Sequence, residues 1–399
     1  MENLASKSTS ASNLEAFALS DVGCIRTNNE DNFVCQTLWT DNYLLLAAID
    51  GVGGQEGGEV ASAIAAESLS HYLETYTNGD ALQLLKQAVR QANDDIFDQR
   101  LQRPEVSRMS CVLTSAIVDG HNRLLHMAHV GDTRLYIFVD GKLRKLSHDH
   151  SLVGYREEIG DLTEEEAMHH PQRNLISRDV GSERFTDDSF VEGETFPLPT
   201  NSTLLLCSDG LTDLLTAAEI TAILQQKVSV EQKCHQLVDA AKAAGGKDNV
   251  TVVLAHYTGA GNPDWGKCAA RLDSQSPEAL KAQASKQAAE QTLVNAAPTE
   301  TLRTEAVKEP IPPQEENTQP VKRSKRRLRR WVLALLMLLI GLAIGFCAGR
   351  YTAPKPAPEP VDTVSKSNDS IHDTSQHDSI SDSVSDTANK DNKKENNKK

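Results

Sequence analysis

The sequence predicts one layered α+β domain, in which helices cover a β-sandwich, followed by a tether and a single transmembrane helix. Three observations support this prediction. Short apolar runs of strand length alternate with helical patterns between residues 14 and 257. The composition then turns to Ala, Gln, Pro, Glu and Thr, as in a flexible connector. An uncharged apolar run near the C-terminus, about 19 residues long, is long enough to cross most of a hydrocarbon layer.

The domain is expected to span residues 13–258, after a disordered leader at 1–12 that is rich in Ser, Asn and Ala and has no periodicity. Within it, apolar runs have strand length, and several are rich in β-branched residues. They are YLLLAAI (43–49), TSAIV (114–118), RLYIF (134–138), TLLLC (203–207) and VTVVLAHY (250–257). These runs predict the strands of one compact β-rich core.

Helical patterns occupy residues 58–76, 81–101 and 217–245. Asn78-Gly79 separates the first two, which predicts an antiparallel helical pair over one face of a sheet. The third pattern is long enough to cover another face. The expected architecture is therefore helix, sheet, sheet, helix.

Beyond the domain we expect a flexible linker at 259–321, a basic juxtamembrane segment at 322–330, a transmembrane helix at 331–349 and a disordered polar tail at 350–399. Basic residues stay on the cytoplasmic side of a span, so the N-terminal domain is expected in the cytoplasm and the tail outside a single-pass cell-membrane protein. The basic segment has an alternative interpretation as a nuclear-localisation or nucleic-acid patch, which its position directly before the span disfavours.

The composition excludes several functional classes. Acidic residues number 56 against 41 basic ones, and the net charge of -15 makes a nucleic acid an unexpected partner. The 7 cysteines are scattered and contain no C-x-x-C pair, so neither a disulfide framework nor a thiolate zinc site is predicted. The N-terminus has no apolar stretch, so we expect no secretory signal peptide.

Asp-Gly pairs occur in two different settings in the domain. The pairs at 119–120 and 140–141 have strand-like sequence on both sides, which is typical of hairpin turns. The pairs at 50–51 and 209–210 instead end an apolar run and open a Gly-rich loop or a helical stretch. Carboxylates in the second setting suit a site for a hard cation.

Two further acidic positions lie at strand edges, Glu30-Asp31 in RTNNEDNF and Asp248-Asn249 in GGKDNVTVV. Each alone is more often a cap or turn residue. Together with Asp50 and Asp209, however, they can converge at one rim of a sandwich, where aspartates repel one another unless cations lie between them. The sequence therefore predicts a divalent metal site.

The order of motifs closely resembles the metal-dependent Ser/Thr protein phosphatases of the PP2C (PPM) family, bacterial branch, over residues 14–257. The motifs are RTNNEDNF, AAIDGVGGQEGGEVAS, AHVGDTRLYIF, LSHDHSLV, HHPQRNLISRDVG, LLLCSDGLTDLL and GGKDNVTVV. The resemblance implies an αββα four-layer sandwich, with two antiparallel sheets flanked by helix pairs and the metal site at one end. It also implies that Asp50 bridges two Mn2+ or Mg2+ ions, that the Gly51 carbonyl binds one of them, and that Asp209 and Asp248 hold the first metal. These three aspartates are the catalytic residues we expect.

The resemblance extends to weaker ligands and to the substrate phosphate. It places Asp31 near the first metal and Glu30 at the second through water. Bacterial members often bind a third, weaker ion, for which Asp132 in GDTR, together with Asp209, is the matching candidate. Arg26 matches the family's phosphate-binding arginine, whose fork can hold two phosphate oxygens. We expect Arg134 to be structural and to pair a carboxylate under the site.

Phosphomonoester hydrolysis needs a nucleophile near neutral pH and neutralisation of a dianion. A pair of metals ~3.5 to 4 Å apart supplies both through a metal-activated water and a clamp on the oxygens. The cysteine route is excluded, because a cysteine phosphatase loop needs Cys-x5-Arg and no cysteine here has Arg six positions on.

The sequence departs from the family in the Asp-Gly loop. Many members carry a histidine there that is proposed to protonate the leaving alkoxide, whereas this chain has Val52 and Gln55. Glutamine cannot act as an acid, so either a metal-bound water does so or turnover is reduced. Residues 149–181 match the mobile flap of bacterial members. Other histidines are candidates in principle, although a lone histidine is more often a core or loop residue: His71, His126, His129 and His150.

We therefore expect a membrane-anchored protein phosphatase that acts on phosphoserine and phosphothreonine of cytoplasmic proteins and opposes bacterial Ser/Thr kinases, with those kinases and their substrates as partners. The alternative is an inactive or weakly active membrane-tethered phosphoprotein-binding module, which the Asp-Gly loop favours and the complete carboxylate set disfavours. A partner-switching phosphatase acting on an anti-sigma-factor antagonist would usually carry a sensory or multi-span region, and a pure scaffold would leave the motifs unexplained.

Overall fold

The fold is built on two antiparallel sheets. The computed structural model describes residues 4–52 and 57–283. The first sheet has the order β1 (Leu4–Ala11), β2 (Leu14–Asp21), β11 (Val250–Tyr257), β10 (Ser202–Cys207), β7 (Arg134–Val139) and β8 (Lys142–Lys145). The second has the order β3 (Asn32–Leu38), β4 (Thr40–Val52), β5 (Ser110–Asp119), β6 (Leu124–Val130) and β9 (Glu192–Pro197).

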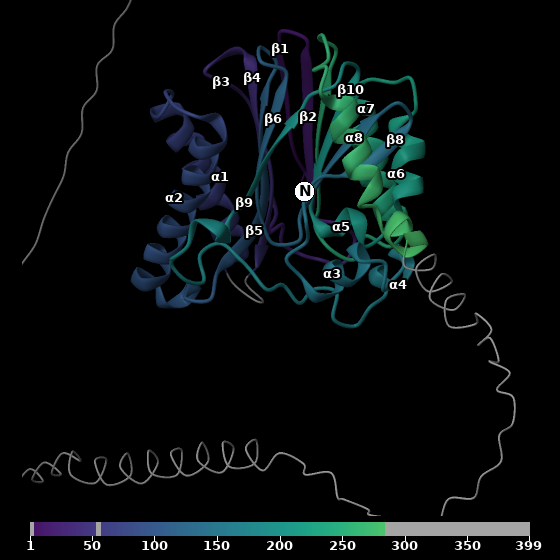
Figure 1. Cartoon of the computed structure of the whole chain (residues 1–399). Helices are drawn as coiled ribbons and strands as arrows, with labels where there is room; N and C mark the ends of the chain where they lie inside the picture. Colours follow the sequence, from purple (N-terminus) through teal and green to yellow (C-terminus); the bar gives the residue numbers. More distant parts are fainter. Residues whose placement is uncertain (1–3, 53–56, 284–399) are drawn as a thin grey trace, which may run out of the picture. The chain divides into compact units, whose positions relative to one another are not determined.

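Helices cover the outer face of each sheet (Figure 1). Helices α1 (Gly58–Thr75) and α2 (Ala81–Gln102) pack on the second sheet through one aliphatic cluster. Helices α5 (Asp209–Thr212), α6 (Ala217–Leu224) and α7 (Val230–Ala243) pack on the first sheet through another. A third cluster fills the space between the sheets. The predicted α+β class with two antiparallel sheets flanked by helices is confirmed.

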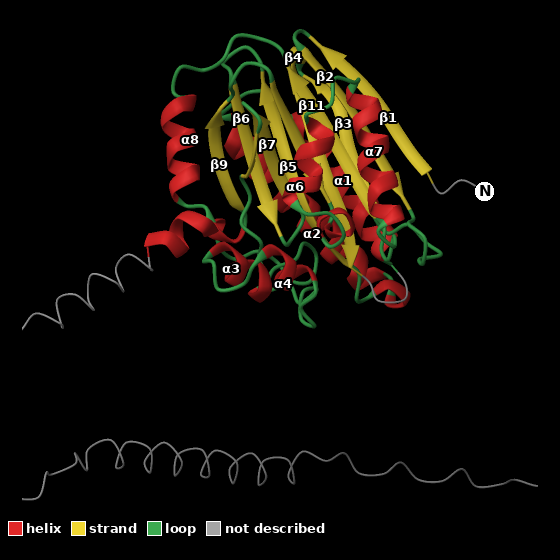
Figure 2. Ribbon diagram, turned by 90° about the vertical axis from the view of Figure 1, so that its right-hand side faces the viewer, coloured by secondary structure: helices red, strands yellow, loops and turns green. Residues whose placement is uncertain are grey.

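Smaller elements complete the described chain. Short 3₁₀ turns lie at η1 (Pro104–Val106) and η2 (Asp188–Phe190). Helices α3 (Leu152–Glu158) and α4 (Glu164–Met168) lie in segment 149–181, which resembles the flap of bacterial members and is called the flap below, and α8 (Trp265–Ser274) follows the last strand. Figure 2 shows α3 and α4 below the ends of the strands.

Most of the predicted elements form where the patterns indicate them, and both predicted hairpins are present. The turn between β7 and β8 has Asp140 at φ 52° and Gly141 at φ 73°, the left-handed pair that such a turn requires. The third helical pattern is different, because α6 ends at Leu224 and α7 begins at Val230. The Ser229 hydroxyl accepts the Gln232 amide and so caps a new helix.

The prediction of a disordered leader at 1–12 was wrong. Residues 4–11 form β1, which pairs with β2 along its whole length, from Leu4 opposite Asp21 to Ala11 opposite Leu14. Backbone hydrogen bonds to the neighbouring strand hold this edge strand, so it does not need an apolar pattern. Asn13 lies in the turn between the two strands with φ 60°. Asparagine adopts this left-handed conformation more readily than most residues, so Asn13 is a local sequence signal for the hairpin.

The expected domain end at 258, with a flexible linker from 259, was also wrong. Trp265 and Cys268 of α8 are buried in the cluster between the sheets, so the folded unit continues past residue 258. No helix among the described residues is long and apolar enough to cross a membrane. The segments predicted at 322–330, 331–349 and 350–399 lie outside the described residues.

Candidate metal centre

The predicted carboxylates come from four separate parts of the chain. Asp50 lies near the end of β4, opposite Val112 of β5. Asp31 directly precedes β3, Asp209 begins α5 after β10, and Asp248 lies just before β11. Each is therefore fixed by the end of a strand, which is a rigid part of the fold.

These carboxylates lie close enough for their charges to act on one another. Burial raises the pKa of Asp50 well above its ordinary value, and the charges of Asp31, Asp209, Asp132 and Asp248 raise it further. Such mutual repulsion requires the groups to be close together in a region of limited solvent. The structure thus brings together the aspartates that the sequence placed at separate strand ends.

Asp31 and Asp209 are affected in the same way. Burial raises the pKa of Asp31 to about 7, against a Ser208 hydroxyl that donates to its Oδ2 at 2.7 Å. Burial and then repulsion from Asp132 and Asp213 raise the pKa of Asp209 well above its ordinary value. The side-chain atoms of this cluster that could bind a metal are all carboxylate oxygens, and a divalent cation between them would relieve their repulsion. The residues therefore fit Mn2+ or Mg2+.

Asp132, the candidate for a third ion, lies in the turn between β6 and β7. Burial raises its pKa to about 7, as does the charge of Asp149, while Arg134 lowers it. Asp132 and Asp209 line a pocket together with Asp213 and with flap residues that include Arg173. Arg173 donates to Asp213, which joins the flap to α5.

Asp213 was not among our candidates. It follows Asp209 by four residues, and its amide donates to the Asp209 carbonyl at 2.7 Å, so the two side chains share one face of a helical turn. Burial raises its pKa, and Arg173 opposes this effect. The four-residue spacing of the two aspartates in DGLTD is the sequence signal that could have indicated this residue.

Gly51 occupies a place where no side chain fits. A Cβ atom there would lie 2.3 Å from the Gly58 carbonyl oxygen and 2.5 Å from the Glu30 carbonyl oxygen. The Glu30 amide in turn donates to Asn249 Oδ1 at 2.9 Å, and burial raises the pKa of the Glu30 carboxyl. Gly51, whose carbonyl is predicted to bind one of the metals, and Glu30, predicted at the second metal, therefore lie side by side through their backbones.

Asn249 is a positioning residue that sequence reasoning missed. It is buried, and its Nδ2 donates to the Val22 and Asn28 carbonyls at 3.0 and 2.9 Å. These bonds hold the loop that carries Arg26 and Glu30. Its position directly after Asp248 in the KDN motif is the sequence signal that could have indicated this role.

Arg26, the predicted phosphate-binding residue, lies at the rim of the cluster with a half-exposed side chain. Its Nη2 donates to Asp248 Oδ2 at 2.8 Å, and its Nη1 lies 4.0 Å from Glu30. Burial lowers its pKa, but the bond to Asp248 and nearby carboxylates outweigh this and raise the pKa above the ordinary value. The guanidinium therefore stays charged and has further donors for an incoming anion.

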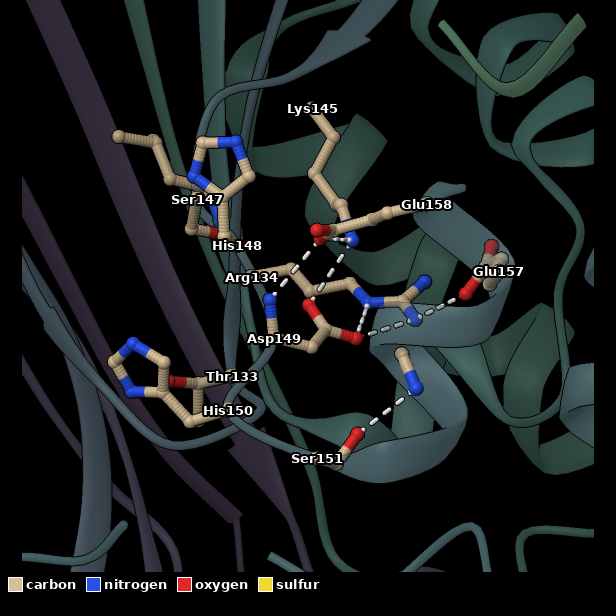
Figure 3. A network of polar contacts seen from close by, with 12 residues as sticks. Thr133, Arg134, Lys145, Ser147, His148, Asp149, His150, Ser151, Glu157 and Glu158 are labelled. Atoms are coloured by element: carbon tan, nitrogen blue, oxygen red, sulfur yellow. Dashed lines mark hydrogen bonds and ion pairs between the residues drawn. The ribbon is translucent and has the colours of Figure 1, made fainter. Parts of the chain in front are cut away.

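Arg134 pairs a buried carboxylate, as we predicted (Figure 3). Its Nε and Nη2 donate to Asp149 Oδ2 at 2.9 and 2.7 Å, and Nη2 also donates to Glu157 at 2.8 Å. Lys145 bonds Asp149 at 3.1 Å and Glu158 at 2.7 Å. Burial alone would raise the pKa of Asp149, but Arg134 and Lys145 lower it to about 2. This network joins β7 and β8 to α3, and sequence reasoning did not foresee its extent.

Two of the candidate histidines lie away from the carboxylates. His71 is exposed on α1, thirteen residues after Gly58, which begins this helix at the site. A helix rises about 1.5 Å per residue, so His71 lies about 20 Å along the axis from Gly58. His126 Nδ1 bonds Thr195 Oγ1 on β9 at 2.9 Å, in the half of β6 nearer the hairpin with β5. Neither is placed to protonate a leaving group. Val52 ends β4, whereas Gln55 lies outside the described residues.

His129 and His150 lie beside Glu192 with their ligand atoms close enough to hold a metal. However, both ring nitrogens of His129 are engaged, Nδ1 with the Thr114 hydroxyl and Nε2 with the His148 carbonyl. His150 Nδ1 accepts the Gly131 amide at 3.1 Å, so its Nε2 carries the proton. The cluster is therefore a hydrogen-bonded support for the turn that carries Asp132.

Comparisons with known proteins agree with this geometry. A family model described as protein phosphatase 2C matches residues 26–255. The Serine/threonine phosphatase stp of Listeria welshimeri is 36% identical over 241 residues, which are 59% of this chain and 92% of that protein. PstP of Mycobacterium tuberculosis is 37% identical over 239 residues, 60% of this chain and 44% of that protein.

Solved structures give the same result. The crystal structure of Mycobacterium tuberculosis PstP/Ppp is similar with a TM-score of 0.55 and 35% identity, over 61% of this chain and 99% of that one. The catalytic domain of PstP in complex with 2 manganese ions is similar with a TM-score of 0.54 and 33% identity, over 61% and 98% of the two chains.

Proposed function

The chain belongs to the protein phosphatase 2C family and is a metal-dependent Ser/Thr phosphatase, and we propose that the carboxylates at the end of its sandwich carry this activity. The observation behind the proposal is the convergence of Asp31, Asp50, Asp209 and Asp248 from four strand ends. These side chains repel one another and offer only oxygen donors.

Asp50, with Asp209 and Asp248, would hold two Mn2+ or Mg2+ ions, with the Gly51 carbonyl as a further ligand, and Asp31 and Glu30 next to them. When bound, such ions supply a nucleophilic water at neutral pH and neutralise phosphate charge. Hydrogen bonds keep these metal-binding groups in place: the Ser208 hydroxyl donates to the Asp31 carboxylate, and the Glu30 amide donates to Asn249 Oδ1.

Arg26 would bind the substrate phosphate. Its side chain is half exposed and already turned toward the cluster by its bond to Asp248. A planar guanidinium donates to two oxygens at once, so it can hold the phosphate and Asp248 together. This fixes the orientation of the phosphoryl group relative to the carboxylates.

The test is phosphate release from a phosphothreonine peptide by the full chain, with Mn2+ and with EDTA, in the wild type, Asp50→Asn and Asp209→Asn. Asp140→Asn is the matched control, because Asp140 is exposed in a turn at φ 52°, a conformation that asparagine tolerates. We expect metal-dependent release in the wild type and the control, and a loss of about 100-fold or more in the other two. Equal release by all four proteins would overturn the assignment.

The alternative of a weakly active phosphoprotein-binding module rests on Val52 and Gln55 in the Asp-Gly loop. A binding measurement on the same peptide separates the two functions. Tight Mn2+-dependent binding without release would establish the module. Multiple turnover establishes the enzyme.

We also propose that the chain is anchored in the cell membrane by residues 331–349, with its phosphatase domain in the cytoplasm, where it opposes Ser/Thr kinases. The support is the sequence alone, an apolar run directly after the basic segment 322–330. Protease treatment of intact cells should cut the tail at 350–399 and spare the domain. A protected tail would reverse the orientation, and recovery of the full chain in the soluble fraction would refute the anchor.

A further inference from the structure

Helix α8 closes one edge of the sandwich, beyond the part of the chain that matches the family model. Figure 2 shows α8 beside β9, at the edge where the two sheets end. Trp265 and Cys268 are buried between the sheets, and the Arg144 guanidinium lies 5.9 Å from the Trp265 ring centroid. The helix is thus part of the folded core.

Ion pairs fix α8 to both sheets. Asp273 accepts from Arg144 Nε at 2.6 Å and from Lys142 at 3.2 Å, both on β8 of the first sheet. Arg271 donates to Glu194 on β9 of the second sheet. Arg144 is mostly buried, so water screens its ion pair with Asp273 less than it screens the other two, and this pair should be the strongest of the three. The end of α8 is therefore anchored where the chain turns toward the flap.

The chain that follows α8 contacts the flap. Ser276 starts a further helical turn, accepting the Ala279 amide with its hydroxyl, and the helix runs from 277 to the end of the described segment at 283. A Cβ atom on Gly160, in the turn between α3 and α4, would lie 3.0 Å from the Pro277 carbonyl oxygen and 3.7 Å from Lys281 Cβ. Segment 275–283 therefore lies directly against this turn.

Opposite charges also favour the contact between segment 275–283 and the start of α4. The first turn of α4 contains Glu164, Glu165 and Glu166. Bonds from Thr163 lower the pKa of Glu166, and the positive charges of Lys281 and Arg156 lower it further. Lys281 is therefore close enough to act on the acidic start of α4.

The flap segment that 275–283 contacts also lines the metal-centre pocket. Glu157, Glu164 and Met168 of α3 and α4 line this pocket together with Asp132 and Asp209. A displacement of the α3–α4 turn would change the shape and charge of that pocket.

We propose that residues 275–283 form a strap that holds the α3–α4 turn in place, so that the route by which the chain leaves the phosphatase domain regulates the pocket beside the metal centre. A pull on the chain after residue 283, or a partner bound there, acts on the flap through this strap. The effect on turnover rests on the proposed function, whereas the hold on the flap does not.

The experiment compares full-length wild type, Lys281→Glu and Lys267→Glu. Lys267 lies on the exposed face of α8 and pairs with its exposed neighbour Asp264, so its reversal is a matched change of charge on α8 itself. Hydrogen exchange of the amides at 157–168 reports the order of the flap. The Mn2+ concentration for half-maximal phosphate release reports the pocket.

In Lys281→Glu we expect the amides at 157–168 to exchange about threefold to tenfold faster, because a surface attraction becomes a repulsion. The Mn2+ requirement should rise about twofold to fivefold, and both values should stay unchanged in Lys267→Glu. Faster exchange at 157–168 in Lys281→Glu, with no detectable phosphate release by any of the proteins, would support the strap and refute the proposed function. Equal exchange at 157–168 in all three proteins would overturn the strap.

Discussion

The buried network around Asp149 gives a stability prediction that can be worked out from the structure. Arg134 and Lys145 lower the pKa of this carboxyl to about 2, from an ordinary value of 3.8. The difference corresponds to about 2.5 kcal/mol of the free energy of unfolding, since one pKa unit is worth ~1.4 kcal/mol. Because the pKa is lowered in the folded state, this stability is present above pH 4 and is lost as the pH falls toward 2.

The perturbation is Asp149→Asn, measured by urea unfolding of the full chain. We expect the variant to lose about 2 to 3 kcal/mol at pH 7, because it leaves Arg134 and Lys145 short of a buried partner. The difference from wild type should fall to about half at pH 3, because the Asp149 carboxyl of the unfolded wild type, with its ordinary pKa of 3.8, takes up a proton there while the folded-state carboxyl stays mostly ionised.

The control is Asp161→Asn, which breaks an exposed pair with Arg156 in the same part of the chain. Its cost should stay below about 1 kcal/mol. A cost of less than about 1 kcal/mol for Asp149→Asn at pH 7, or a cost that does not change between pH 7 and pH 3, would mean that the ion pairs of Asp149 do not stabilise the fold by this amount.

Three further predictions concern the site and the added helix. Arg26→Ala should raise KM for a phosphothreonine peptide about tenfold to 100-fold, because it removes a charged hydrogen bond to the phosphate; an unchanged KM in steady-state assays would exclude that role. Mn2+ should raise Tm more at pH 8 than at pH 5.5, because Asp31 and Asp132 keep protons up to about pH 7 and a cation must displace them; a larger increase at pH 5.5 in thermal-shift measurements would contradict this sign. Trp265→Ala should cost about 3 kcal/mol in urea unfolding, since it empties a buried site between the sheets; a cost under about 1 kcal/mol would mean that α8 is not part of the core.

The sequence predicted the parts of the fold that local patterns determine. Apolar runs at 43–49 and 250–257 lie within β4 and β11, and the turn at Asp140 is where its Asp-Gly pair indicates. Asp50 and Asp209 stood out because each followed a buried strand. Strand ends meet at one edge of a sheet, so these side chains could be expected to converge.

Other parts depend on contacts that no local pattern records. Strand β1 is held by backbone pairing with β2, and its polar side chains looked like those of a leader. Helix α8 contains one buried tryptophan, Trp265, which pairs with a distant part of the fold. Arg134 finds its partners Asp149 and Glu157 fifteen and twenty-three positions along the chain. Such pairs appear only when the chain is folded.

The most direct test of a metal centre at the end of the sandwich is a count of the Mn2+ ions bound by the full chain, by calorimetric titration, in the wild type, Asp50→Asn and the control Asp140→Asn. We expect at least two ions per chain in the wild type and the control, and fewer in Asp50→Asn, because Asp50 would hold both ions of the pair. The same number of ions bound with the same affinity by Asp50→Asn and the wild type would contradict a metal centre built on this cluster.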